Sequence, residues 1–146
     1  MDERERYRRG MDVRRAVLGE AYVRGALRNR TELTAEFQDL LTRYAWGEVW
    51  TDPGLPRSTR SLLVIAMMVA LNRPDELRLH LRAALTNGAT REEITEVMLQ
   101  AAIYCGVPAA NAAIHVAVEV LGEGDHPAPP RRAARPRPIT RRTPKR

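Results

Sequence analysis

The sequence contains a single cysteine, Cys105, among 146 residues. An internal disulfide is therefore impossible, and so is any CxxC redox or zinc motif, since each needs at least two cysteines. Long apolar runs are also missing. The longest, Leu62 to Leu71, falls well short of the roughly 20 residues that a membrane span needs, and it indicates a buried helix instead.

Other familiar signatures are absent as well. The first ten residues, MDERERYRRG, include no apolar signal region, which favours a cytoplasmic location. We find no metal-ligand spacing, no nucleophile elbow and no phosphate-binding glycine loop. Strand signals are nearly absent, because β-branched residues never alternate with polar ones for long. The sequence therefore predicts a helical protein without a metal or nucleotide motif.

The basic residues are concentrated at the C-terminal end. The net charge is +6, but residues 127–146 hold eight Lys or Arg, no acid and six of the ten prolines. The first 126 residues keep 16 basic and 18 acidic groups. We expect residues 1–126 to form one domain. Residues 127–146 should form a disordered tail, since they have too little apolar surface to offset the entropy of ordering. Charge alone could attract nucleic acid to this tail, but no aromatic residue there could stack on bases, so we do not expect such a partner.

Helix start and stop signals are frequent and predict an all-α domain of about six helices. They are a helix over 3–18 that Gly19 ends, one capped by Thr34, one from Pro56 through Leu71, one from Pro74 to Gly88, one opened by the Thr90–Glu93 capping box, and one from Pro108 to Gly122.

A carboxylate continues an apolar stripe on the helix that Thr34 caps. At 100° per residue, Phe37, Leu41, Tyr44 and Glu48 fall on one narrow face, which we interpret as facing the core. Burying a charge is costly unless it is paired. Either the helix frays after Tyr44 and Glu48 reaches water, or Glu48 is a functional carboxylate at the mouth of a pocket.

Two arginines stand at the start of the apolar helix that follows. Acidic residues are the usual preference in a first turn, so Arg57 and Arg60 favour an anionic ligand there. The alternative is that both arginines only solvate an exposed helix end.

His80 lies at the edge of the apolar stripe of Leu77, Leu81 and Ala84, one helical turn after Glu76. A histidine in such a place is more often a boundary residue than a catalyst. Its ordinary pKa near neutrality would nevertheless suit proton transfer, and Glu76 is within i,i+4 reach of it.

The remaining candidates are weaker. We expect Cys105 to be a buried small hydrophobe and His115 to lie at the surface or an interface. Tyr104 could line a pocket, although a core position is its default. Trp46 projects opposite Phe37 and Tyr44, which predicts an exposed tryptophan at a subunit interface.

Three stretches in this order, "WGEVW", "ELRLH" and "IYCGVPAA", resemble the 4-carboxymuconolactone decarboxylase family over roughly residues 5–121. The resemblance implies an all-helical fold of the alkyl hydroperoxidase D type, a homo-oligomer (a hexamer is favoured) and a step of protocatechuate breakdown by the β-ketoadipate route. His80 matches the histidine that follows the CxxC of the peroxidase relatives, and Arg73 and Glu76 stand in place of those two cysteines. After "WGEVWT" the decarboxylases usually have an arginine, whereas this chain has Asp52.

The chemistry implied by the resemblance needs no cofactor and no metal, because the lactone substrate can delocalise the electron pair that decarboxylation leaves. On this hypothesis Arg60, with Arg57 and Tyr104, would bind the anionic substrate. His80 would deliver the proton, and Glu48 or Glu76 would orient the imidazole ring of His80 or help relay the proton. The alternatives are a related decarboxylase with another lactone or carboxylate as substrate, a thiol peroxidase, and a helical scaffold without activity.

Overall fold

The computed structural model describes residues 1–122, which form seven α-helices and one π-helix and no strand. The elements are α1 (Glu3–Leu18), α2 (Glu20–Arg28), α3 (Glu32–Leu40), the π-helix η1 (Leu41–Val49), α4 (Arg57–Ala70), α5 (Pro74–Thr86), α6 (Arg91–Tyr104) and α7 (Val107–Leu121). The predicted all-α fold is confirmed. Helix α2 was missed, and the predicted tail at 127–146 lies outside the described residues.

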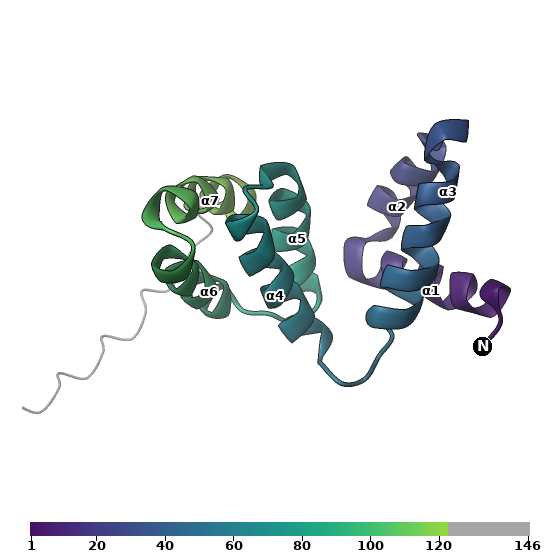
Figure 1. Cartoon of the computed structure of the whole chain (residues 1–146). Coiled ribbons are helices and arrows are strands. Elements are labelled where there is room, and N and C mark those ends of the chain that lie inside the picture. Colours follow the sequence, from purple (N-terminus) through teal and green to yellow (C-terminus); the bar gives the residue numbers. More distant parts are fainter. Residues whose placement is uncertain (123–146) are drawn as a thin grey trace, which may run out of the picture.

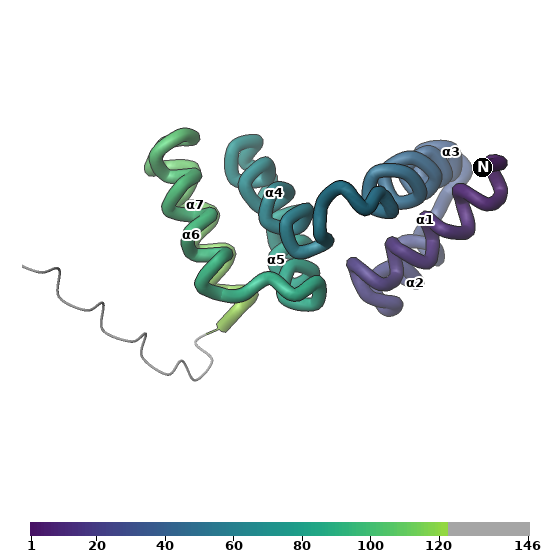
Figure 2. Tube along the Cα trace, turned by 90° about the horizontal axis from the view of Figure 1, so that it is seen from below, coloured from purple at the N-terminus to yellow at the C-terminus, as the bar shows by residue number. Residues whose placement is uncertain are grey.

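The helices form two groups (Figure 1). Helices α1, α2 and α3, with η1, lie together on one side, and α4 to α7 lie on the other. The loop between η1 and α4 connects the two groups, and α4 and α5 stand between α1 and the α6–α7 pair (Figure 2). Within residues 1–122, no helix is both long enough and apolar enough to cross a membrane.

Local sequence explains most helix ends. Pro74 occupies the first turn of α5, where its missing N–H costs nothing. Thr90 and Glu93 form the predicted capping box of α6. The cap of α3 is Thr31 rather than Thr34, although Thr34 completes that capping box through its own hydroxyl.

Two apolar clusters share helix α5. Its Leu77, Leu81 and Ala84 pack into a core built with α4, α6 and α7. Its Ala83 faces the other way and joins a second cluster with Val13, Val17, Trp46 and Trp50. Because α5 contributes to both cores, it holds the two helix groups together. His80 lies one turn before Ala83 on this helix.

The predicted inward face of the Thr34–Glu48 helix was wrong. Phe37 and Tyr44 are 60% and 45% exposed, whereas Trp46 is only 5% exposed and stacks on Trp50 at a centroid distance of 5.1 Å. The π-helix explains this result, because its i→i+5 hydrogen bonds widen each turn and bring Gly47 onto the same face as the buried Thr42, Trp46 and Trp50. The tryptophan expected at an interface is therefore a core residue.

Two glycines let α1 cross η1 at very short range. A Cβ atom on Gly10 would lie 1.9 Å from the Thr42 carbonyl oxygen, and a Cβ atom on Gly47 would lie 2.4 Å from the Arg6 carbonyl oxygen. No other residue type could occupy either position without moving the helices apart. This crossing places the side chains of α1 beside Glu48.

Candidate functional site

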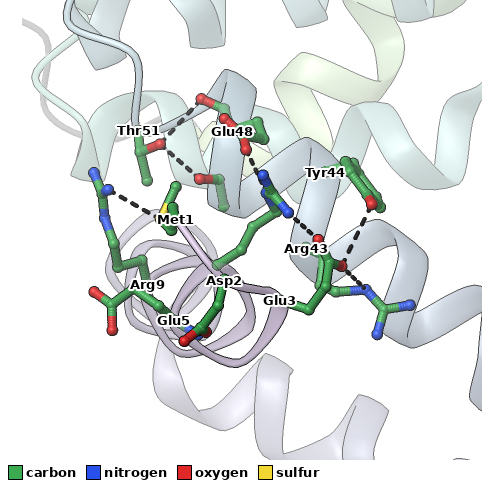
Figure 3. Close-up of polar contacts among 11 residues, drawn as sticks. Met1, Asp2, Glu3, Glu5, Arg9, Arg43, Tyr44, Glu48 and Thr51 are labelled. Carbon is green, nitrogen blue, oxygen red and sulfur yellow. Dashed lines mark hydrogen bonds and ion pairs between the residues drawn. The ribbon is translucent and has the colours of Figure 1, made fainter.

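Glu48 is held by an arginine from the first helix. The Arg6 guanidinium donates from Nε to Glu48 and from Nη1 to Glu3, so it bridges two carboxylates. Figure 3 shows these two glutamates and Tyr44 close together. It also lies over the Tyr44 ring, with Cζ 5.3 Å from the centroid. The hydrogen bond with Glu48 raises the pKa of Arg6 above its ordinary value. The helix does not fray before Glu48, because η1 continues to Val49.

Arg60 projects from the first turn of α4 and contacts the loop before that helix. Its Nη2 donates to the backbone carbonyl of Asp52 at 3.0 Å and lies 3.5 Å from the Asp52 Oδ1 atom. The Arg60 side chain is only 13% exposed, and its Nε is buried without a hydrogen-bond acceptor among the described residues. A guanidinium that is fixed by one backbone contact and still reaches a depression is suited to binding an anion.

Glu48 and Arg60 line one depression, together with Val49 and Asp52. Its volume of about 390 Å³ is in the range of small-molecule sites. Two candidates that the sequence indicated separately, a carboxylate and an arginine, therefore line the same depression. Neither His80 nor Tyr104 is among the residues that line it.

Arg57 lines a neighbouring depression of about 440 Å³ between α1 and the loop before α4. Arg9 and Asp12 of α1 contribute to its wall, as do Trp50 and Asp52. Asp52 thus borders both depressions, and the two arginines that were predicted together open onto different sides of it.

His80 is partly buried on α5, and its Nδ1 atom is buried without a hydrogen-bond partner among the described residues. Burial lowers the pKa of His80 below its ordinary value of 6.5, and the charge of Glu76 partly opposes this shift. Glu76 itself is exposed. It therefore acts on the ring through charge, and it does not fix the tautomer by a hydrogen bond to Nδ1.

Two weaker expectations for the end of α6 were wrong. Tyr104 is 80% exposed rather than buried, and Cys105 is exposed although it was expected in the core. Both residues line an apolar groove between α4 and α6 with Thr59 and Leu62. The helix ends at Tyr104, so Cys105 leaves the apolar stripe to which a longer helix would have assigned it.

Sequence reasoning missed the partners of the two charged candidates. Nothing in the local pattern links Arg6 to Glu48, which is 42 residues away in the chain. The signal that could have found the contact is the pair of glycines, Gly10 and Gly47, since small residues mark a close helix crossing. Asp52 was noticed as an unusual residue, but its contact with Arg60 was not expected.

The chain matches the carboxymuconolactone decarboxylase family over residues 35–119. It is 51% identical over 121 residues to the 4-carboxymuconolactone decarboxylase of Acinetobacter baylyi, which covers 83% of this chain and 90% of that protein. It is also 45% identical over 114 residues to nitrosuccinic acid decarboxylase npaB of Metarhizium robertsii, covering 78% and 80% of the two chains. The matched segment includes Glu48, Arg57, Arg60 and His80, but not Arg6.

Proposed function

Because the chain belongs to the carboxymuconolactone decarboxylase family, we propose that it decarboxylates 4-carboxymuconolactone to β-ketoadipate enol-lactone in protocatechuate catabolism. The observation that carries this proposal is the 51% identity to a 4-carboxymuconolactone decarboxylase, which extends over nine-tenths of that enzyme's length. The family inferred from "WGEVW", "ELRLH" and "IYCGVPAA" is confirmed by the same match.

The reaction breaks the bond between a ring carbon and a carboxylate. The electron pair that remains is delocalised into the lactone carbonyl as a dienolate, and a proton then adds to a ring carbon. The enzyme needs to bind two carboxylates, stabilise the developing oxyanion and deliver the proton. These tasks call for cationic and acid–base side chains, and this chain offers both kinds.

We assign substrate binding to the two arginines of α4. Arg60 is the stronger candidate, because its side chain is mostly buried and the guanidinium lines the depression with Glu48. Arg57 is exposed and opens onto the adjacent depression. Two arginines on either side of one loop suit a ligand with two carboxylates. Tyr104 lies outside the depression with Glu48, so its role in binding stays a prediction.

We assign proton delivery to His80. In the free enzyme, burial lowers the pKa of this histidine, so the ring is mainly neutral at pH 7. An anionic substrate that comes close would favour the protonated ring and raise that pKa. Substrate binding would then protonate His80, and this proton is the one that the dienolate takes up after decarboxylation. The buried Nδ1 atom, which has no partner among the described residues, supports this role, since a satisfied structural histidine would have one.

The two glutamates have different supporting roles in this proposal. Glu48 is only partly buried and already neutralised by Arg6, so it suits a relay or positioning role at the edge of the depression. Glu76 favours the protonated state of His80 through its charge.

A second candidate is decarboxylation of another carboxylic acid by the same site. The 45% identity to a nitrosuccinic acid decarboxylase favours it. Asp52 also lies beside Arg60 at a position where the resemblance leads us to expect an arginine, so the charges of this site differ from the usual pattern of the family. This alternative keeps the same residues in the same roles and changes only the acid that binds.

We also propose that the protein assembles as a homo-oligomer, with a hexamer favoured, and works in the cytoplasm. Large apolar side chains along α3 and η1 are exposed: Leu33 at 92%, Phe37 at 60%, Leu40 at 51% and Tyr44 at 45%. They form one outward stripe, and exposed apolar surface of this extent is typical of an interface.

The proposed cytoplasmic location is supported by Cys105. An exposed free cysteine fits a reducing compartment.

The test is carbon dioxide release from freshly prepared 4-carboxymuconolactone by the purified full chain. A positioned general acid is typically worth about 10²- to 10⁴-fold in rate. We therefore expect His80→Gln to lower kcat by about that factor while the protein still folds. Arg60→Ala should mainly raise KM, and Glu48→Gln should lower kcat.

The matched control is His115→Gln, the same substitution at an exposed histidine of α7. It should retain the wild-type rate. If His80→Gln turned over as fast as His115→Gln, the assignment of the proton donor would be wrong. If the wild-type protein released no carbon dioxide from the lactone but did so from nitrosuccinate, the second candidate would replace the first.

A further inference from the structure

Asp52 already engages the arginine that we assign to the substrate. It accepts a hydrogen bond from Arg60 Nη2 through its backbone carbonyl at 3.0 Å, and its carboxylate lies 3.5 Å from the same nitrogen. The backbone contact positions the guanidinium. The carboxylate adds a negative charge that a bound anion would have to displace or tolerate.

The same carboxylate borders both depressions, in which acidic and basic side chains are mixed. Arg60 and Glu48 line one of them, and Arg9, Arg57 and Asp12 line the other. Asp52 is thus the acid common to both depressions, and a ligand reaching both would pass it. Its side chain is 63% exposed, so its charge is not buried beneath the site but lies at the surface that a ligand approaches.

Building on the proposed function, we propose that Asp52 sets the charge selectivity of this site. Its carboxylate competes with the ligand for Arg60 and disfavours a dianion more strongly than a monoanion. Electrostatic energy is proportional to the product of the charges, so the repulsion is about twice as large for a dianion as for a monoanion. The preference of this site for dicarboxylates over monocarboxylates is therefore smaller than it would be if the arginines acted without Asp52.

The substitution Asp52→Asn separates charge from structure. The variant would keep the backbone carbonyl that positions Arg60. The side-chain amide oxygen could still accept the hydrogen bond that Asp52 Oδ1 now accepts from the Gly54 N–H at 2.8 Å. Only the negative charge would be lost.

The experiment measures binding without turnover. Succinate and butyrate have four carbons each and carry two charges and one charge, and each is titrated into the isotope-labelled full chain by NMR. Exposed ion pairs contribute little energy, so we expect the succinate Kd of Asp52→Asn to fall about two- to fivefold. The repulsion removed is half as large for butyrate, so its Kd should fall by about the square root of that factor. Both gains should shrink at high salt.

The matched control is Asp75→Asn, which removes the same charge from an exposed pair with Arg78 at the far end of the α4–α5 hairpin. It should leave both Kd values unchanged. The proposal is overturned if Asp52→Asn binds succinate no better than wild type, or if Asp75→Asn improves binding equally. Because succinate binding needs no decarboxylation, a protein that fails to release carbon dioxide could still pass this test, and the reverse is also true.

Discussion

Replacing Gly10 with alanine should separate α1 from η1 and destabilise the protein. The added Cβ atom would lie 1.9 Å from the Thr42 carbonyl oxygen and 2.9 Å from the Gly47 nitrogen. An unstrained carbon–oxygen contact is about 3.3 Å or longer, so the helices would have to move apart by more than about 1 Å. Both obstacles are backbone atoms, which cannot rotate away as a side chain could.

The expected cost follows from two opposing effects. Overpacking a tight contact costs about 1–3 kcal/mol, and a contact with backbone belongs at the upper end. Alanine recovers about 1 kcal/mol of helix propensity relative to glycine. The net loss is then about 2 kcal/mol. For a helical body of this size we expect the Tm to fall by about 6–12 °C.

Gly25→Ala is the matched control, because Gly25 is also helical but a Cβ atom there would meet nothing within 4 Å. This variant should gain about 0.5–1 kcal/mol and raise the Tm. Thermal unfolding followed by circular dichroism compares the two. If Gly10→Ala were as stable as Gly25→Ala, the close crossing of α1 and η1 would be refuted, and with it the placement of Arg6 beside Glu48.

Two further predictions concern His80 and the apolar stripe on α3 and η1. Burial lowers the pKa of His80 in the folded state, so the unfolded chain binds the proton more tightly. The free energy of unfolding is therefore undiminished above about pH 6.5, the ordinary pKa of histidine. It decreases as the pH falls from there toward the pKa of the folded state. Urea unfolding should therefore show His80→Gln gaining stability relative to wild type between pH 7.5 and pH 5, and parallel curves would contradict the burial of the ring. Light scattering should give an oligomer for the wild-type chain and a smaller species for Phe37→Glu, whereas a wild-type monomer would remove the proposed interface.

Several helix boundaries were predictable because they depend on local chemistry. Pro74 and the Thr90–Glu93 box mark the starts of α5 and α6 within a residue of the structure. Gly19 ends α1 as predicted, with a φ of 88° that favours glycine. Helix α2 was missed because it begins directly after this glycine and spans nine residues, too few for a clear apolar period.

The inward face of α3 and η1 was not predictable from an α-helical projection. Apolar residues lie on both faces of this segment, and the projection assumes a constant 100° per residue. The choice between the faces depends on Gly47, because only a face that includes this glycine lets α1 approach closely. A π-helix widens that face, and its formation depends on tertiary contacts that a local pattern does not encode.

The candidate site illustrates the same division between local and tertiary information. The sequence indicated Glu48 and Arg60 separately. Glu48 is a carboxylate that continues an apolar stripe, and Arg60 is a cation near a helix N-terminus, where acidic residues are more usual. What turns them into neighbours of one depression is the loop from Trp50 to Pro56, which returns the chain from the end of η1 to the start of α4. Because Asp52 lies in that short loop, its contact with Arg60 follows from the same return. A substitution at position 52 therefore acts directly on the arginine that we propose to bind the substrate, and the charge at this position is a sharper probe of the proposed site than any residue of the surrounding helices.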